Sequence, residues 1–302
     1  MNRILRRGLM LGMVAGWAFA SQASAADKLR LLIIDGQNNH AWQAMTPPMK
    51  ADLEKSGRFT VDVATTPPKN AGKSEWAKFH PDFSKYDVVL SNYNGEPWPA
   101  EVEKALETYV ANGGGLAVIH AANNAFEKWP AWNKMIGLGW RQASFGDRVT
   151  VNEEGKVVRT PKGEGPGSSH GPQHAFKIVV RNPDHPITQG MPTEWMHAKD
   201  ELYHGQRGPA ENMEILATAY SAKEKSGTGT NEPMIWIIPY GKGRVFTTVM
   251  GHVSANDTTA IRCNGFKTVM LRGAEWAATG KVSIPIPDDF PTADQVSVGK
   301  PK

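Results

Sequence analysis

Three histidines stand just beyond apolar runs that are typical of buried β-strands. His40 follows LRLLIID after a short polar stretch, His120 closes LAVIH, and His252 follows GRVFTTVMG. In open parallel sheets, ligands bind in the crevice beyond the carboxyl ends of the strands. The strands before His40 and His120 are expected two ladder spacings apart, about 10 Å, which two imidazoles could bridge around one ion or ligand. One such histidine is usually just a hydrogen-bonded side chain, but three together favour a site.

The pentapeptide DELYH, residues 200–204, adds two carboxylates, a phenol and an imidazole. With the strand-end histidines it would supply either general acid and base groups or nitrogen and oxygen ligands for a divalent ion. A surface turn with solvated charges is the alternative, and no HExxH spacing supports a metal. We take as catalytic candidates His120, His252 and Glu201. The candidate metal ligands are His40, His120, His252 and His204.

Polar and aromatic side chains beside these positions are candidates for ligand binding. Aromatic faces near a polar cleft suit the apolar face of a sugar ring, although core filling accounts for most of the tryptophans. We expect only Trp42 and Trp98 to line the cleft. The full set of candidate ligand-binding residues is His40, Asn39, Trp42, Asn94, Trp98 and Tyr203.

A second pair of histidines, in His170-Gly-Pro-Gln-His174, looks like a chelate. Gly171 and Pro172 exclude a helix that would present both rings on one face. We therefore expect a loop there, and we assign no function to His197.

Two further features exclude cofactor classes. Cys263 is the only cysteine, which excludes an intramolecular disulfide and a cysteine-based zinc or iron–sulfur site; we expect a packed or capping thiol. The glycine run at 113–115 precedes an expected strand instead of opening a helix, and it lacks Walker or dinucleotide spacing. It predicts a helix stop and no nucleotide cofactor.

Residues 1–25 have the pattern of a secretory signal peptide. Arg3, Arg6 and Arg7 precede an apolar run, and ASA at 23–25 is a small-x-small cleavage site. The run is shorter than the roughly 20 apolar residues of a membrane anchor, so we expect cleavage near Ala26 and no stable membrane insertion. An exported chain without disulfides fits the bacterial periplasm or the extracellular medium.

Removal of this segment lowers Lys plus Arg from 34 to 31 against 30 Asp plus Glu, a net charge of +1. No basic excess remains to predict DNA or RNA binding. The composition, 40% hydrophobic and 21% charged, argues against disorder and against a membrane bundle. The 302 residues allow one or two domains; we expect one, and the sequence leaves the oligomeric state open.

Apolar runs alternate with amphipathic stretches, which predicts right-handed βαβ crossovers. The expected strands are 29–35, 59–64, 87–91, 116–120, 176–180, 214–219, 234–239 and 243–249, and the expected helices are 49–55, 99–112 and 265–278. The prediction is an α/β, flavodoxin-like three-layer sandwich with a mostly parallel sheet. Segment 139–174 predicts a loop-rich insertion, and 283–302 an extended or loose tail.

A known family has the same motifs in the same order. GQNNHAW, GGGLAVIHAA, NPDHPITQGMP, DELYH and YGKGRVFTTVMGH, followed by a closing helix with GAEWA, resemble the ThuA-like (trehalose utilisation) family. The similarity runs from about residue 29 to residue 280. It implies a ThuA-like domain at 26–282 with a class I glutamine amidotransferase-like fold.

The resemblance also implies what this chain does not do. In amidotransferases of this fold, a nucleophilic cysteine sits on the turn after the strand equivalent to LAVIH, and its histidine follows a later strand. Here His120 stands at the turn and His252 at the histidine position. Imidazole cannot simply replace the thiolate, so we expect no glutaminase activity.

ThuA-like proteins are associated with disaccharide and keto-sugar metabolism, so the resemblance implies a small-molecule carbohydrate ligand. We expect an exported enzyme whose histidine-rich site, with a divalent metal for which zinc is the best match, hydrolyses or isomerises a sugar derivative. Without a metal, the histidines would act directly as acid and base. The alternatives are a non-catalytic sugar-binding module and an interaction scaffold with a vestigial crevice.

Overall fold

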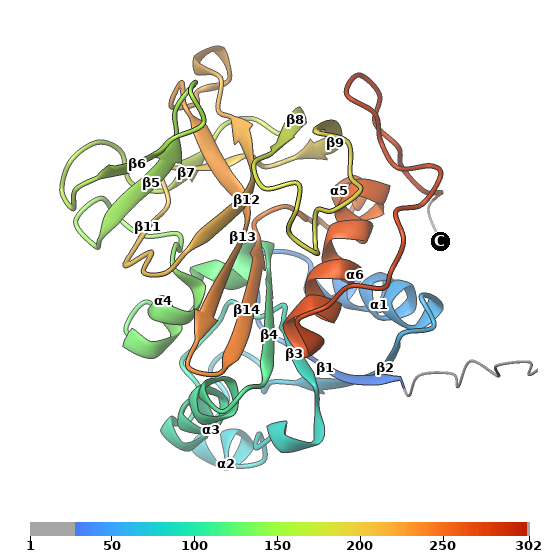
Figure 1. Ribbon diagram of the computed structural model, residues 1–302. Coiled ribbons are helices and arrows are strands. Elements are labelled where there is room, and N and C mark those ends of the chain that lie inside the picture. The colour runs from blue at the N-terminus through green and yellow to red at the C-terminus, as the bar shows by residue number, and fades with distance from the viewer. Residues whose placement is uncertain (1–27, 301–302) are drawn as a thin grey trace, which may run out of the picture.

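Five parallel strands, four from the N-terminal half of the chain and one from its C-terminal part, lie at one end of a large sheet (Figure 1). The structure is a computed structural model, and it describes residues 28–300, so the expected signal peptide lies outside the described residues. The parallel strands, in spatial order, are β2 (Phe59–Thr65), β1 (Leu29–Asp35), β3 (Val88–Ser91), β4 (Gly115–Ile119) and β14 (Gly243–Thr248). The predicted two-spacing separation of β1 and β4, with β3 between them, is confirmed.

Beyond β14 the sheet becomes antiparallel. The strands that follow are β13 (Asn231–Tyr240), β12 (Glu214–Tyr220), β8 (His174–Val180) and β9 (Glu194–Asp200). The α/β class is confirmed, but the expectation of a mostly parallel sheet is wrong, because the sheet is mixed. The physical reason is the connection between β13 and β14, where only Gly241 and Lys242 join the strands and a hairpin of that length forces antiparallel pairing.

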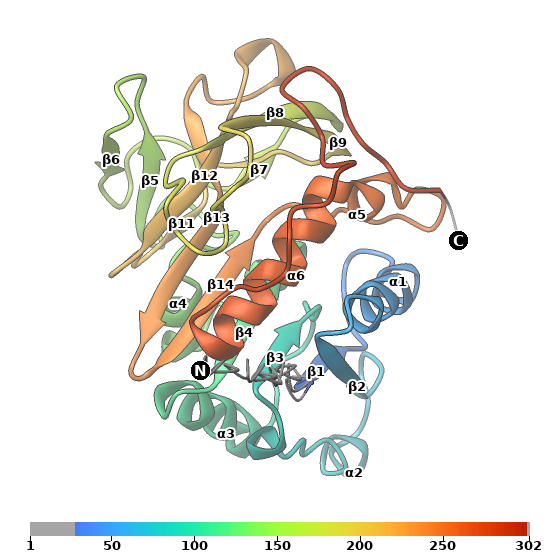
Figure 2. The same cartoon turned by 45° about the vertical axis from the view of Figure 1, so that its right-hand side comes forward.

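Helices cover both faces of the sheet. Figure 2 shows α1 (Trp42–Lys55) beside α6 (Asn264–Thr279) on one face, and α3 (Ala100–Ala111) with α4 (Pro130–Ile136) on the other. The short helices are α2 (Lys73–Trp76), α5 (Thr259–Arg262) and the 3₁₀ turns 83–85, 120–124 and 223–225. No helix among residues 28–300 is long and apolar enough to cross a membrane.

Local sequence explains the core-facing sides of these elements. The residues between Leu31 and Asp35 of β1 are all buried, as a strand covered on both faces requires. Helix α3 starts after Pro99 and buries the i, i+4, i+8 face formed by Val102, Leu106 and Val110. Helix α1 begins at Trp42, seven residues before its expected start, and continues through two prolines.

The segment 139–174 is more regular than expected. It contains the hairpin β5 (Asp147–Val151) and β6 (Val157–Thr160), followed by β7 (Ser169–His170). Strand β5 pairs with β11 (Arg207–Gly208), and β7 pairs with β10 (Tyr203–His204). The segment thus combines loops with short strands, and buried side chains on β5, including Val149, attach it to the edge of the sheet.

The chain after Ser283 has neither helix nor named strand, and it runs over α6 (Figure 2). Buried Glu275 fixes its start: the carboxylate accepts hydrogen bonds from the backbone N–H groups of Ser283 and Ile284 and pairs with Arg58 Nε at 2.8 Å. Burial alone would raise the pKa of Glu275, but the hydrogen bonds from Ser283, Ile284 and Arg58 outweigh it and lower the pKa.

We predict that Glu275→Gln destabilises the protein by about 2 kcal/mol at pH 7, because the amide nitrogen would face N–H donors. Because the pKa of Glu275 is lower in the folded protein than in the unfolded chain, Glu275 makes its full contribution to stability above the unfolded value of about 4.3. This contribution is lost as the pH falls through the folded pKa. Urea unfolding of the wild type and the variant at pH 7 and at pH 4 measures this. A stability difference of the same size at both pH values would contradict it.

Candidate functional site

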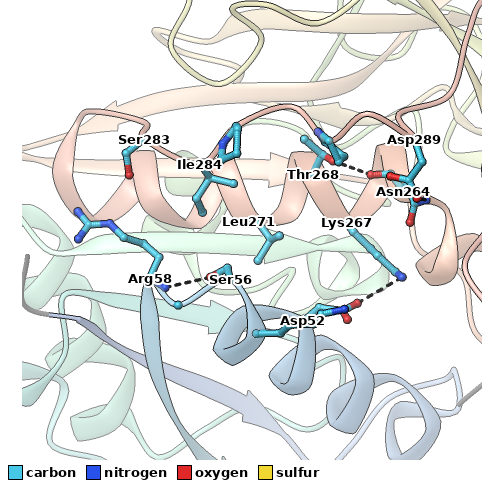
Figure 3. A pocket seen from close by; sticks show the side chains of 14 residues that line it. Asp52, Ser56, Arg58, Asn264, Lys267, Thr268, Leu271, Ser283, Ile284 and Asp289 are labelled. Atoms are coloured by element: carbon cyan, nitrogen blue, oxygen red, sulfur yellow. Dashed lines mark hydrogen bonds and ion pairs between the residues drawn. The ribbon is translucent and has the colours of Figure 1, made fainter. Parts of the chain in front are cut away.

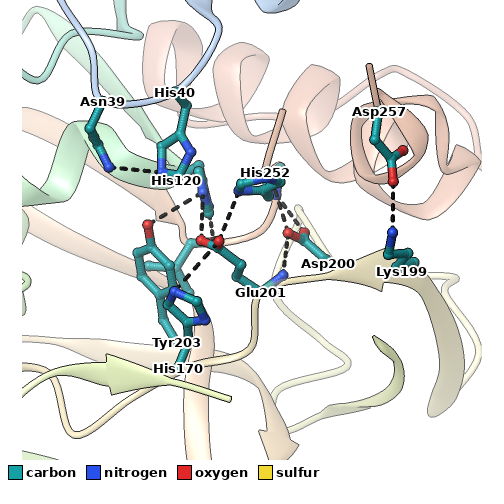
Figure 4. Close-up of polar contacts among 12 residues, drawn as sticks. Asn39, His40, His120, His170, Lys199, Asp200, Glu201, Tyr203, His252 and Asp257 are labelled. Atoms are coloured by element: carbon teal, nitrogen blue, oxygen red, sulfur yellow. Dashed lines mark hydrogen bonds and ion pairs between the residues drawn. The ribbon is translucent and has the colours of Figure 1, made fainter. Parts of the chain in front are cut away.

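Four side chains from four separate segments meet at the carboxyl ends of the strands (Figure 4). His40 comes from the loop after β1, His120 directly follows β4, Glu201 directly follows β9, and His252 lies in the loop after β14. One nitrogen or oxygen atom of each lies within 4.8 Å of those of the others. The strand-end rule therefore predicts the place where the three imidazoles meet.

The backbone at His120 is held in a conformation that L-residues rarely adopt. Its φ is +48°, in the left-handed region, which costs of order 1–3 kcal/mol for a residue other than glycine. Its Nδ1 lies 2.7 Å from the carbonyl oxygen of Val249; since a carbonyl only accepts, Nδ1 carries the proton. The lone pair of Nε2 in the neutral ring then faces the cluster, where the hydroxyl of Tyr203 lies 3.3 Å away.

His252 brings an unsatisfied nitrogen into the same place. Its Nδ1 is buried and has no hydrogen-bond partner among the described residues, although Glu201 Oε1 is only 3.1 Å away. The two atoms are close without the alignment of a hydrogen bond. A buried orphan nitrogen beside a carboxylate oxygen is the arrangement expected where both bind a third group.

His40 is held by amide side chains. The Asn39 amide lies 3.1 Å from His40 Nε2, and Asn94 Nδ2 donates to Asn39 Oδ1 at 2.6 Å. The His40 backbone N–H donates to Asn38 Oδ1 at 3.0 Å. The His40 ring packs 4.7 Å from the ring of His120 and 4.6 Å from that of His252, between centroids.

Asp200, which is fully buried, ties two of the segments together (Figure 4). Its Oδ1 accepts from the backbone N–H of Glu201 at 2.7 Å and from that of His252 at 3.0 Å. Its Oδ2 accepts from the Gly251 N–H and from His197 Nε2, both at 2.7 Å. One carboxylate thus fixes the backbone of two site residues relative to each other.

Burial and mutual contacts shift the pKa values of the site. Burial, aided by repulsion from His120, lowers the pKa of His40 to about 3. Burial would raise the pKa of Glu201, but contacts with His120 and His252 outweigh it and hold the pKa well below its usual value. Burial would lower the pKa of His252, yet Glu201 raises it. Glu201 is therefore a carboxylate, and His40 offers a neutral imidazole.

This donor set could hold a metal ion. Neutral imidazole nitrogens and a carboxylate oxygen are common ligands of divalent transition metals. His120 donates its Nδ1–H to a backbone carbonyl, and histidines that bind metals usually make such a hydrogen bond with the nitrogen that does not bind the metal. The orphan Nδ1 of His252 is a further atom that a cation would satisfy.

Seven candidate residues lie at this site and two others do not; the seven are His40, His120, His252, Glu201, Tyr203, Asn39 and Asn94. The expectation for His204 is wrong: its Nδ1 lies 3.0 Å from the hydroxyl of Ser221, because neighbouring residues of a strand point to opposite sides. Trp98 does not line the cleft either. It is buried in an aromatic cluster with Tyr93 and Phe126. Trp42, partly buried, opens α1 two residues after His40.

Sequence reasoning missed two contributors. His170 was expected in a loop without a role, but its Nε2 lies 3.5 Å from Glu201 Oε1. His197, which was given no function, is fully buried and donates to Asp200. The only available signal for His170 was its residue type, since the pairing of β7 with β10 depends on the tertiary fold.

Cys263 is a buried free thiol, as expected of a packed cysteine. It lies beside His197, and the two groups shift each other's pKa. Burial would raise the pKa of Cys263, but His197 lowers it. Burial would lower the pKa of His197, but Cys263 and Asp200 raise it to about 9. This pair lies behind Asp200 and outside the four-residue cluster.

A separate groove of about 780 Å³ lies between α1, α6 and the C-terminal segment (Figure 3). Among its charged groups, Lys267 Nζ pairs with Asp52 Oδ2 at 3.8 Å. The potential metal-binding group found among the described residues is the histidine cluster, which does not line this groove. The cluster is therefore the stronger candidate for chemistry.

The protein therefore has an α/β fold with a cluster of histidines at the carboxyl ends of its parallel strands. The sequence profile of the ThuA family, described as trehalose utilisation, matches residues 30–277. The chain therefore belongs to the ThuA family. No curated protein matches it in sequence.

Solved structures agree with this assignment. The chain is 44% identical to a ThuA-like protein from Parabacteroides merdae ATCC 43184, with a TM-score of 0.86, covering 90% of this chain and 98% of that one. A ThuA-like protein from Bacteroides uniformis ATCC 8492 is 19% identical, with a TM-score of 0.53 and coverage of 90% and 97%. The second likeness concerns the fold alone.

We predict that Asp200→Asn weakens the binding of a divalent ion by about 10- to 100-fold, the usual effect of losing an outer partner of metal ligands. The amide nitrogen would face a backbone or imidazole N–H, so Glu201 and His252 would lose their common anchor. Competition between the protein and a chromophoric chelator for Zn²⁺ measures the affinity. Asp257→Asn, which removes a carboxylate paired with Lys199 at 3.0 Å, is the matched control; equal affinities of all three proteins would refute the role.

Proposed function

We propose that this protein is an exported enzyme of carbohydrate metabolism that uses a zinc-dependent histidine site to hydrolyse or isomerise a disaccharide or keto-sugar derivative. The observation that carries the proposal is the convergence of His40, His120, His252 and Glu201. The family's description, trehalose utilisation, supports the carbohydrate class.

Three imidazoles with a nearby carboxylate are the ligand types of catalytic zinc sites, which keep a position open for water or substrate. His40, His120 and His252 would hold the ion, and Glu201 would be a fourth ligand or the base. When bound, zinc would polarise a carbonyl oxygen or lower the pKa of a water molecule. The chain's own residues would then orient the sugar and move its protons.

Glu201 is the group best placed to move a proton. It lies 3.6 Å from His120 Nε2 and 3.1 Å from His252 Nδ1, so imidazoles flank it on two sides. A carboxylate in this position can take a proton from water during hydrolysis or from the carbon beside a keto group during isomerisation. Tyr203, whose hydroxyl contacts His120 Nε2, can hold a substrate oxygen or donate a proton to it.

The same geometry argues against glutamine hydrolysis. The strained turn after β4 carries an imidazole at His120 where a nucleophilic thiol would be required. Cys263, the only cysteine, is buried just before α6 beside His197. We propose that the turn serves to present a ligand or acid–base group.

We predict that the purified protein binds about one zinc ion per chain and that His120→Ala and His252→Ala each weaken this binding at least tenfold. Metal analysis after dialysis, with chelator-treated protein as the reference, measures the content. His80→Ala, an exposed histidine, is the control. A wild-type protein that retains no metal would refute the metal-dependent proposal.

A panel of disaccharides and their 3-keto forms, with and without chelator, tests the reaction. An enzyme should lose turnover in the His120 and His252 variants while sugar binding largely survives. Equal loss of both would indicate the sugar-binding module. Variants without any effect would indicate the interaction scaffold.

We also predict export with cleavage before Ala26, because ASA at 23–25 follows a basic and then an apolar segment. Expression of the full chain in a Gram-negative host, fractionation and mass spectrometry of the intact product would measure it. An Ala25→Tyr variant should accumulate as precursor, since the cleavage site requires a small residue. A wild-type product that retains residues 1–25 would contradict the prediction.

A further inference from the structure

His170 is held firmly beside Glu201 by the insertion that carries it. Buried Arg207 donates from Nε to the Pro166 carbonyl at 3.0 Å and binds further carbonyls of residues 161–164. Ser168 accepts from the Arg141 N–H at 3.0 Å. On the other side of His170, a Cβ on Gly171 would come within 1.8 Å of the Lys225 carbonyl oxygen, so this backbone passes another chain segment too closely for a side chain. The position of His170 is therefore built into the fold.

His170 is the outermost imidazole around Glu201. Its side chain is 36% exposed, against 1% for His120, 12% for His252 and 8% for Glu201. Figure 4 shows His170 beside Tyr203, on the opposite side of Glu201 from His40. Of the three imidazoles that contact Glu201, His170 is therefore the one most accessible to solvent.

The tautomer of His170 makes it an acceptor toward Glu201. Nδ1 lies 2.7 Å from the carbonyl oxygen of Gly171, so Nδ1 carries a proton, and in the neutral tautomer Nε2 keeps a lone pair. This Nε2 lies 3.5 Å from Glu201 Oε1. Two acceptors at that distance do not bond each other, and a donor that reaches both would satisfy both.

His120 makes the same arrangement on the inner side, with Nδ1 bonded to a backbone carbonyl and Nε2 3.6 Å from Glu201 Oε2. The difference is that His120 belongs to the four-residue cluster and His170 does not. The inner nitrogen is thus suited to an ion, and the outer one to a group of the substrate.

Aromatic side chains flank the outer acceptor pair. The Tyr203 ring is nearly parallel to that of His170, at 20° and 6.2 Å between centroids, and Trp140, partly buried, lies 5.8 Å from His170. Apolar ring faces beside hydrogen-bond acceptors suit a molecule with both C–H and O–H groups.

We propose that His170 Nε2 and Glu201 Oε1 together accept hydrogen bonds from a hydroxyl-bearing substrate, so that His170 is a substrate-binding residue of a neutral polyol site. The inference rests on the proposed function and adds to it the residue that selects hydroxyl groups. It assigns this selection to the insertion, because residues 139–174 carry both His170 and Trp140.

The test separates sugar binding from ion binding in the full zinc-loaded protein. The variants are His170→Leu, His170→Gln and the matched control His174→Leu, since His174 has its own Nδ1 contact with a backbone carbonyl, that of Pro172. The probes are Zn²⁺ alone, trehalose, maltose, cellobiose and their 3-keto forms, and tetrahydropyran as a ring without hydroxyls. Isothermal titration calorimetry measures each affinity.

We expect His170→Leu to weaken the binding of the best sugar about tenfold or more, the effect of losing one hydrogen bond. His170→Gln, whose side-chain oxygen can still accept, should stay within about threefold, and Zn²⁺ affinity should be unchanged in both. Tetrahydropyran should not bind measurably.

Three results would overturn the inference. A fall of Zn²⁺ affinity in His170→Leu would make His170 a metal ligand. An equal loss of sugar binding in His174→Leu would point to the segment as a whole. Zinc-loaded wild type that binds none of the sugars would refute the polyol site while leaving the metal site intact, whereas failure to bind zinc at all would refute the proposed function itself.

Discussion

The geometry of the site depends on the buried carboxylate of Asp200. Strands β14 and β9 are separated in the sheet by β13, β12 and β8, so on a flat sheet their ends would lie about 19 Å apart. The sheet must therefore twist and curl until the end of β9 returns over the end of β14. Asp200 makes this closure specific, because it binds the N–H groups of Glu201, Gly251 and His252 at once.

Stability alone does not explain the cluster that this closure produces. Buried imidazoles around one carboxylate leave Nδ1 of His252 without an aligned hydrogen bond, although Glu201 Oε1 is 3.1 Å away, and His120 occupies a left-handed backbone conformation. A core built for stability would replace such groups with apolar side chains of similar size. Local strain and unsatisfied polar atoms that coincide at the carboxyl ends of parallel strands indicate a site shaped for a ligand.

The sequence predicts those parts of the fold and site that depend on local pattern. The apolar run of β1, the buried face of α3 and the end of β4 follow from periodicity and from glycine and proline positions. His40, His120 and His252 follow from their places after strands. The choice of Glu201 over His204 could not be predicted from the sequence, because it depends on which side of the chain faces the site. The prediction that Trp98 lines the cleft was wrong because residue type does not distinguish a buried aromatic cluster from a cleft wall.

The larger errors concern contacts distant in sequence. A chelate need not lie on a helix, so Gly171 and Pro172 excluded only one way of using His170; the two-residue pairing of β7 with β10 provides another.

The mixed sheet gives the site two parts with different origins. Its parallel half presents the imidazoles of His40, His120 and His252, while the antiparallel half and its insertion contribute Glu201, Tyr203 and His170. Because the inner imidazoles stand at the ends of the central strands and His170 lies on a peripheral segment, changes in the insertion can alter the surroundings of His170 without disturbing the arrangement of the inner imidazoles.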